Sequence, residues 1–495
     1  MVRLSRLGPI AALAAGLFAA TLPAAAQDIT IAIGSEPSTL DPQLRDDGGE
    51  RMVNDNIYET LMARTPEGEL VPGLAAAEPT QIDETTWEFD LKDGITFHNG
   101  EPFNADSVVA SVERIIDPAN ASEQMGYLNT ITGAEKVDDD TVRITTSGPD
   151  PILPSRMYWM KMIPAEYASS EDIGSAPVGT GPYKFVAWDR GNEITLEANE
   201  DYWDGGAPEI KNVTYRFVGE PGTRLSGLMA GEFDVIIGLL PEFVSSVPRS
   251  AAVDGLETSV LILGTDNEIV SDPKVREALN LAIDRDAMVE ALFQGYASVA
   301  GGHHVNPRAF GFNDALEPYS YDPEKAKALI EEAGATGKTI RIVGEPGRWL
   351  KSREQVEAIA AYWNAIGLDV SIEVQEFSQY LDSLMGDGPR PDAIFVANSN
   401  ELLDADRESS FIYHMGGAAA SNSDAEMAEK IDAARVTTDV DAREELYHEV
   451  FQKGRDLSYT APLFNLQDIY GMSERMEWQP RPDAKLLIKE MSVSE

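Results

Sequence analysis

The chain has 495 residues, of which 43% are hydrophobic and 25% are charged, and its formal charge is -45 at pH 7. This composition is close to that of an average soluble globular protein and excludes a disordered or fibrous chain, while the length indicates roughly three domain-sized units. Because a surface this acidic repels phosphate groups, we expect no nucleic acid partner and no binding to anionic membranes.

The N-terminus has the three parts of a secretory signal. Arg3 and Arg6 precede an apolar run over residues 10–22, and Ala24–Ala26 stands directly before Gln27. As a helix, the apolar run would span about 20 Å, which is shorter than the ~30 Å hydrocarbon core of a bilayer. We therefore predict a signal peptide over residues 1–26, cleaved after Ala26, rather than a membrane anchor.

The sequence contains no cysteine. This excludes disulfides, thiolate metal sites, cysteine catalysis and attachment of a lipid to an N-terminal cysteine. We therefore expect a free periplasmic protein and not a lipoprotein.

The first half of the chain is rich in predicted strands. One helix is predicted from Asn104, a good N-cap residue, with Val108, Val109, Val112 and Ile115 on its apolar face. Gly179-Thr180-Gly181 leads into a strand, so it does not fit a dinucleotide-binding motif and instead predicts a tight backbone crossing. Apolar residues alternate, as in half-buried strands, at residues 87–91, 142–144, 194–196 and 213–217.

The second half alternates helices with strands. A capped helix is predicted at Ser271-Asp272-Pro273, and another at Asp322-Pro323, ended by Gly334. Residues 340–374 follow the pattern of a strand, a helix from about 353 to 366, and a second strand, which indicates a βαβ unit. We find no repeat and no low-complexity linker, so we expect a mixed α/β protein whose lobes are joined by short crossings.

No catalytic or metal motif is complete. The five histidines, at positions 98, 303, 304, 414 and 448, form no zinc-ligand pattern, and we expect the pair His303-His304 on a surface loop. Residues 271–274 match the S-x-x-K of β-lactamase-like enzymes, but neither S-D-N nor K-T-G accompanies them. Acidic residues are too abundant to exclude a carboxylate pair of the glycosidase type. We predict no enzyme, no cofactor and no metal site, with a periplasmic hydrolase as a remote alternative.

Four separated stretches resemble the family 5 extracellular solute-binding proteins, which include binders of oligopeptides, dipeptides and nickel chelates. The likeness begins at Ile29 with IAIGSEPSTLDP and covers nearly the whole chain after the predicted signal, in the order that the family has. The four stretches are residues 86–114 (TWEFDLKDGITFHNGEPFNADSVVASVER), 177–202 (PVGTGPYKFVAWDRGNEITLEANEDY), 271–302 and 321–334 (YDPEKAKALIEEAG).

This resemblance implies an α/β clamshell of the type II, cluster C-like class of periplasmic binding proteins. Lobe I would comprise residues 27–72, 174–262 and 470–495, with an inserted subdomain over 73–173, and lobe II residues 263–469. It also implies a monomeric component of an ABC import system, which traps a small peptide or peptide-like solute and delivers it to a permease and its ATPases in the inner membrane. The same fold is compatible with a metal chelate, an opine or an oligosaccharide as the solute.

Candidates for binding the charged ends of a solute follow from the resemblance. Arg353 resembles the position where dipeptide relatives keep a carboxylate-binding arginine, although a plain surface arginine is the alternative. The stretch from Asn398 to Asp406 lacks the tryptophan and the Asp-Pro turn whose acid holds the solute's ammonium in relatives. Asn398, Asp404 and Asp406 remain candidates there, with helix capping as the alternative for the two acids.

Further candidates lie elsewhere in the chain. Glu36 and Ser38 follow the first strand, where the family's N-terminal segment reaches the cleft. Trp349, Tyr158 and Trp159 are candidates for apolar walls of the site, although aromatic residues more often belong to a core. Arg156 is a weaker candidate for holding an anionic chelate.

Overall fold

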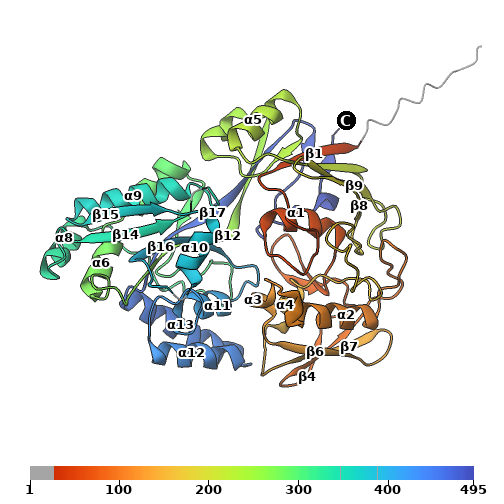
Figure 1. The fold of residues 1–495 in the computed structure, drawn as a ribbon, viewed down its shortest axis with the longest axis horizontal. Helices are drawn as coiled ribbons and strands as arrows, with labels where there is room; N and C mark the ends of the chain where they lie inside the picture. Colours follow the sequence, from red (N-terminus) through yellow and green to blue (C-terminus); the bar gives the residue numbers. More distant parts are fainter. Residues whose placement is uncertain (1–26, 346, 387, 495) are drawn as a thin grey trace, which may run out of the picture.

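The structure is a computed structural model that describes residues 27–345, 347–386 and 388–494. The chain forms two lobes that lie side by side, connected by two long strands, β12 (Arg249–Leu263) and β17 (Thr460–Met472) (Figure 1). Both lobes combine helices with strands, so the predicted mixed α/β fold is confirmed. We call the lobe that contains β1 lobe I and the other lobe II. The predicted signal peptide, residues 1–26, lies outside the described residues.

One mixed sheet runs through both lobes. Parallel pairing of β14 with β15, with a helix between them, confirms the predicted βαβ unit. In order across the sheet, the strands are β15 (Asp369–Val374), β14 (Thr339–Gly344), β16 (Ala393–Ser399), β12, β17, β11 (Val235–Ile236), β1 (Asp28–Ile33), β10 (Asn212–Phe217), β9 (Glu193–Ala198) and β8 (Tyr183–Asp189), and β13 (Ala297–Val299) pairs with β17.

The two lobes meet where β12 and β17 change partners. Residues 249–254 of β12 pair with 472–467 of β17 beside the lobe I strands, and residues 258–262 pair with 465–460 beside β16 of lobe II. Between these two blocks, β12 has a bulge at residues 255–257. Bulges bend a strand locally and increase its twist, so this is the natural hinge. The lobe limits predicted at 262/263 and 469/470 fall inside these strands and stay a prediction.

Lobe I carries an inserted subdomain with its own core. Its antiparallel sheet has the order β4 (Thr80–Asp83), β5 (Thr86–Asp90), β7 (Thr141–Thr146) and β6 (Ile131–Lys136). Helix α2 (Ala105–Ile116) covers this sheet, and Asn104 caps it as predicted. Phe89, Val108 and Val142 are fully buried between the two layers. The remaining elements of lobe I are α1 (Gly48–Ile57), β2 (Met62–Arg64), β3 (Leu70–Pro72), α3 (Met125–Leu128), α4 (Leu153–Met157), α5 (Pro221–Ala230), β18 (Met476–Glu477), β19 (Ser492–Val493) and short 3-10 turns at Pro118–Asn120, Pro241–Ser246 and Ile488–Glu490.

The glycines at 179 and 181 confirm the predicted tight crossing. A Cβ atom at Gly179 would lie 2.0 Å from the carbonyl oxygen of Ile57, and one at Gly181 would lie 2.7 Å from that of Asn56. Real side chains do not fit at such distances. Only glycine therefore lets this segment pass against the end of α1.

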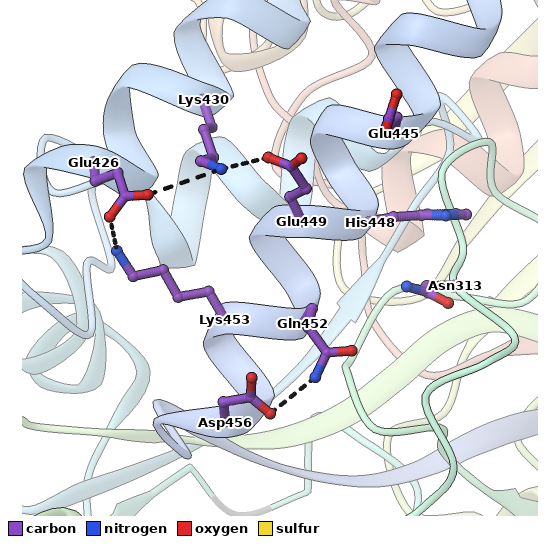
Figure 2. Close-up of a pocket in the computed structure, with 9 residues that line it drawn as sticks. All are labelled: Asn313, Glu426, Lys430, Glu445, His448, Glu449, Gln452, Lys453 and Asp456. Atoms are coloured by element: carbon purple, nitrogen blue, oxygen red, sulfur yellow. Dashed lines mark hydrogen bonds and ion pairs between the residues drawn. The ribbon is translucent and has the colours of Figure 1, made fainter.

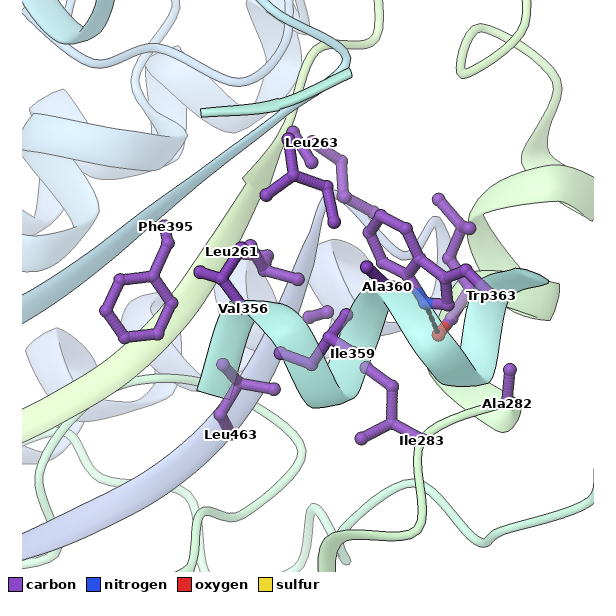
Figure 3. Packing of buried hydrophobic residues seen from close by; sticks show 14 of the residues in the cluster. Leu261, Leu263, Ala282, Ile283, Val356, Ile359, Ala360, Trp363, Phe395 and Leu463 are labelled. Carbon is purple, nitrogen blue, oxygen red and sulfur yellow. Dashed lines mark hydrogen bonds between the residues drawn. The ribbon is translucent and has the colours of Figure 1, made fainter. Parts of the chain in front are cut away.

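Lobe II is organised around α9 (Ser352–Ala365), which packs on its sheet. Figure 3 shows Val356, Ile359 and Trp363 of this helix in one cluster with Leu261 and Leu263 of β12 and Leu463 of β17. Trp363 is fully buried, and its Nε1 donates to the carbonyl oxygen of Leu279 at 2.9 Å. The other helices are α6 (Pro273–Leu281), α7 (Arg285–Met288), α8 (Pro323–Glu332), α10 (Phe377–Met385), α11 (Ala405–Glu408), α12 (Ala425–Val436) and α13 (Val440–Asp456), with π turns at Val289–Phe293 and Ser409–Tyr413.

Two local predictions in lobe II can be checked, and the capped helix predicted at residues 271–273 is confirmed as α6. The N-cap of α6 is Asp272, whose side chain accepts from Lys274 N, while Ser271 donates to the carbonyl oxygen of Glu268. Expecting His303 and His304 on a surface loop was wrong, because both are buried. The His303 ring stacks on Phe451 of α13 with centroids 4.8 Å apart. Packing from a distant helix therefore buries a pair that the local sequence presents as loop.

Candidate functional site

The lobes contact each other through residues 400–408, which we call the contact segment. Oε1 of Glu401 lies 2.7 Å from Nη1 of Arg51 on α1, and Arg407 donates to the hydroxyl of Tyr127 at 2.8 Å. The side chain of Leu402 is buried in the core of the inserted subdomain. In Figure 1, α11 of lobe II and α3 of lobe I face each other across this boundary. The structure therefore shows the two lobes drawn together.

Asp404 holds the contact segment in shape. It is the N-cap of α11, and its side chain accepts from the backbone N–H of Asp406. Arg443 of α13 binds both of its carboxylate oxygens, at 2.7 and 2.6 Å. Such two-point pairs between a guanidinium and a carboxylate are strong and directional. Both oxygens of this predicted ligand residue are thus occupied from within lobe II.

Asp406 links the contact segment to lobe I. Its Oδ2 lies 3.3 Å from Nη2 of Arg156, and its Oδ1 lies 3.1 Å from Nε of Arg435. Arg156 also pairs with Asp150 at 2.7 Å. Two residues that were predicted separately as solute contacts, Asp406 and Arg156, are therefore partners of each other across the lobe boundary.

Two more carboxylates lie at the hinge. Glu257 stands in the bulge of β12, and Asp468 lies on β17 beside Gly255, where a Cβ atom would be 2.8 Å from Asp468 Oδ2. Both side chains are half-buried, and neither forms a hydrogen bond or an ion pair with a residue that the structure describes. Burial raises the pKa of Glu257 to about 8, with a contribution from the charge of Asp468. Burial likewise raises the pKa of Asp468 to about 7.

Tyr470 completes this group, two residues along β17 on the same face as Asp468. It is only 5% exposed, and its ring packs edge-on against Trp478 with centroids 4.8 Å apart. Its hydroxyl has no hydrogen-bond partner within the described part of the chain. Burial raises the pKa of Tyr470, and the charges of Asp468, Asp483 and Glu257 raise it further. We call Glu257, Asp468 and Tyr470 the hinge cluster.

The other lobe I candidates have different surroundings and do not converge on one site. Glu36 accepts hydrogen bonds from Trp188 Nε1 and Gly191 N, both at 2.9 Å, in the turn between β8 and β9. Ser38 is exposed and donates to Glu50 at 2.7 Å. Tyr158 and Trp159 are both buried. The Tyr158 hydroxyl bonds to Asp483 at 2.9 Å, whereas Trp159 stacks on Tyr127, close to the lobe boundary, with centroids 4.5 Å apart.

The remaining lobe II candidates lie at different depths. Arg353 is exposed on α9, and its Nε lies 2.8 Å from Glu357 on the same helix. Trp349 is half-buried, with its ring 5.9 Å from that of Phe395. Asn398 is half-buried on β16 opposite Thr258 of β12, and its Nδ2 has no partner among the described residues. Asn398 therefore stands one position from Glu257 along the paired strands, whereas Arg353 approaches none of the other candidates.

The sequence analysis did not select Glu401 at the lobe boundary or Glu257 and Asp468 at the hinge. Glu401 stood inside a stretch already chosen for its acids, so it could have been included. Glu257 and Asp468 had a weaker signal: Asp468 is the one carboxylate of β17, and Glu257 precedes the apolar end of β12, which also contains Asp254. Lone charges inside such strands are costly unless they are paired or functional.

Two hollows lie outside the hinge cluster. The first hollow has a volume of about 470 Å³ and lies on α12 and α13 (Figure 2). The lysines that line it are paired with glutamates, as Lys453 is with Glu426 at 2.9 Å. A cavity of about 100 Å³ in lobe I is lined by Asp55, Arg64 and Lys485, among others, and Lys485 lies 3.7 Å from Asp55. In the first hollow Lys430 also pairs with Glu449. In the second, Asp55 pairs with Lys161 as well, whereas Arg64, among the described residues, donates only to backbone carbonyl oxygens.

The described residues contain no group of three or more His, Asp or Glu side chains that is placed to share a metal ion. Among the helices of the described ranges, none has both the length and the apolar character that crossing a membrane requires.

Comparisons with known proteins agree on one family. The family model described as bacterial extracellular solute-binding proteins, family 5 Middle, matches residues 69–420 of the chain. The glutathione-binding protein GsiB of Escherichia coli K12 is 32% identical over 319 residues, which is 63% of this chain and 62% of GsiB. The match therefore spans less than two thirds of that relative.

Solved structures extend the likeness to the whole fold. DppA of Helicobacter pylori, in complex with the peptide STSA, is 26% identical with a TM-score of 0.81, covering 94% of this chain and 98% of DppA. AgaA of A. tumefaciens R10, in complex with agropinic acid, is 26% identical with a TM-score of 0.80, covering 94% of this chain and 99% of AgaA. The predicted two-lobed periplasmic-binding-protein fold is confirmed, and the chain belongs to the bacterial extracellular solute-binding proteins of family 5.

Proposed function

We propose that this protein is the periplasmic solute-binding component of an ABC import system, which captures a small peptide or peptide-like solute between its lobes. It would deliver the solute unchanged to a permease and its ATPases in the inner membrane, acting as a monomer. Membership of a binding-protein family supports this role. So does the similarity to the glutathione-binding protein GsiB and to DppA, which was solved in complex with the peptide STSA.

The arrangement of the lobe boundary supports the proposal most directly. Arg51 and Tyr127 of lobe I meet Glu401 and Arg407 of lobe II, so closure has its own polar contacts. On β12, β17 and β16, the side chains of Glu257, Asp468 and Asn398 also keep polar atoms without hydrogen-bond partners among the described residues. A solute that binds these groups and both lobes at once would favour the closed state, because only differential contacts shift a conformational equilibrium.

A thermal-shift screen followed by titration calorimetry tests this function. Glutathione, dipeptides and longer peptides are the first probes. A solute present at a hundred times its Kd adds about 2.7 kcal/mol of stability, which corresponds to roughly 3 °C for a chain of this length. X-ray scattering should show a smaller radius of gyration when the solute is bound. If no solute changes either the melting temperature or the radius of gyration, the proposal is wrong.

An opine is the second candidate solute, favoured by the similarity to AgaA in complex with agropinic acid. Native mass spectrometry of freshly purified protein would decide between the two classes. A retained mass that matches a peptide supports the first candidate, and one that matches a sugar-derived amino acid conjugate supports the second.

A further inference from the structure

The cavity of about 100 Å³ in lobe I is lined by more basic than acidic side chains. The acidic ones are two and the basic ones four, namely Asp55 and Glu59 against Arg64, Arg481, Lys485 and Lys489. An excess of cations is unusual in a chain whose formal charge is -45. What the cavity can bind depends on which of these charges have partners within the chain.

Four of the six charged groups have partners. Arg481 pairs with two carboxylates, at 2.8 and 3.0 Å, and Lys489 lies 3.4 Å from another. Glu59 accepts hydrogen bonds from three neighbouring side chains. Asp55 lies 2.8 Å from Lys161. These groups are therefore balanced by the chain itself.

Arg64 is a buried cation that has no charged partner among the described residues. It is only 9% exposed. Its Nη1 and Nη2 donate to the carbonyl oxygens of Gly68 and Leu402, both at 2.8 Å. Because these two bonds fix the plane of the guanidinium, they also fix the direction of Nε, which has no acceptor in the described structure. Buried donors in native proteins nearly always have a partner, so an acceptor is missing at this nitrogen.

Lys485 is the second cation that the chain leaves poorly paired. Its side chain is 15% exposed, and Asp55, at 3.7 Å, is the one described carboxylate within 4 Å of its Nζ. That Nζ forms no hydrogen bond in the described part of the chain. It lies 4.1 Å from the centroid of the Tyr158 ring, and the guanidinium of Arg64 lies 5.0 Å from the same ring. Two cations therefore approach one ring of the cavity wall, although unpaired buried charges are costly.

We propose that this cavity binds a small oxyanion, held by Nε of Arg64 and Nζ of Lys485. Guanidinium and ammonium groups form their strongest hydrogen bonds with carboxylate and phosphate oxygens. The volume of about 100 Å³ suits an ion of a few atoms, whereas drug-sized ligands occupy pockets of about 300–1,000 Å³. The site lies within lobe I, so it is separate from the solute site between the lobes and does not depend on the proposed function.

Titration calorimetry with inorganic phosphate and with acetate tests this site, at pH 7 and at an ionic strength kept constant with sodium chloride. The wild-type protein should bind at least one of the two anions at one site per chain. K485Q removes one of the two cations, and R64K keeps the charge but lacks Nε. Each should lose tenfold or more in affinity for the anion, because charge-assisted hydrogen bonds are the strong ones.

K211Q is the matched control. Lys211 lies on the surface of lobe I, with its side chain 40% exposed beside Glu200, and its replacement should change the affinity by less than twofold. Binding of phosphate identifies an inorganic oxyanion and binding of acetate alone identifies a carboxylate, and either supports the site. No saturable binding of either anion by the wild type, or wild-type affinity in K485Q, would overturn it. If R64K does not fold, K485Q decides, since the loss of a buried cation should leave its melting temperature at or above that of the wild type without the anion.

Discussion

Replacing Glu257 by Gln should make the empty protein more stable. In the folded chain, burial raises the pKa of Glu257 to about 8, compared with 4.5 when the group is in water. The folded state therefore binds this proton more tightly than the unfolded state does. Its contribution to stability is fully present below pH 4.5 and is lost as the pH rises toward 8. Gln is neutral at every pH and avoids this loss.

The size of the effect follows from the shift. Each unit of pKa corresponds to 1.36 kcal/mol, so between pH 4.5 and pH 7 the raised pKa of Glu257 amounts to about 3 kcal/mol for an isolated, fully buried group. Glu257 is only half-buried, and solvent screening reduces the figure to roughly 2 kcal/mol. With an unfolding entropy of about 1 kcal/mol per kelvin for a chain of this length, the melting temperature should rise by about 2 °C at pH 7.

Calorimetric melting of E257Q and of the wild type at pH 5, 7 and 8.5 measures this prediction. The difference between them should be smallest at pH 5 and should grow with pH. The D254N variant, which alters an exposed carboxylate on the same strand, should follow the wild type at all three values. A variant that is less stable than the wild type at pH 8.5, or a difference that shrinks with rising pH, would show that Glu257 is paired in the folded state.

Three further variants test other parts of the structure. E401Q removes the partner of Arg51 across the lobe boundary. Because Arg51 is partly exposed, we expect the closed state to lose about 1–2 kcal/mol relative to the open state. X-ray scattering should then show a larger radius of gyration than for the wild type with solute present. K351M breaks another inter-lobe ion pair, in which Lys351 Nζ lies 2.7 Å from Glu242, whose side chain is 37% exposed. Such pairs contribute about 0–1 kcal/mol, so calorimetry should show less than a fivefold loss of affinity for the solute. Burial lowers the pKa of His304 to about 3. The stability that this shift contributes is present above pH 6.5 and is lost as the pH falls toward 3. The free energy of unfolding of H304F, measured in urea, should therefore change less between pH 7 and pH 4 than that of the wild type.

Elements that are specified by neighbouring residues could be predicted from the sequence. Asn104 and Asp322 cap α2 and α8 as expected, because a capping side chain bonds to backbone groups two or three positions away. The alternating segments became β5, β7, β9 and β10 for the same local reason. At α6, two neighbouring residues are both good caps, and Asp272 rather than Ser271 takes the position.

The site could be predicted only in part, because pairing depends on residues that are far apart in the chain. Nothing next to Asp404 shows that Arg443 of another helix binds both of its oxygens. Likewise, Asp468 becomes a neighbour of Glu257 only because β17 returns antiparallel beside β12. The family resemblance located the stretch that meets lobe I, but it could not tell which of its acids were free. The roles of Arg353, Trp349 and Glu36 in binding stay predictions.

The acids of the contact segment and those of the hinge cluster therefore differ in whether arginines of this chain pair with them. In the contact segment, Glu401 and Asp406 pair with Arg51 and Arg156 of lobe I and so stabilise closure without a solute. Asp404 instead pairs with Arg443 within lobe II. The acids of the hinge cluster have no cation in contact among the described residues, and burial raises the pKa values of Glu257 and Asp468. A cationic group bound beside them would lower both pKa values, because an opposite charge favours the ionised form of a carboxyl group. Solute affinity should consequently rise as the pH increases from 6 to 8.5, as long as the amine of the solute stays protonated. Calorimetry with Ala-Ala across that range would show it, and a constant affinity would mean that the carboxylates do not change ionisation when the solute binds.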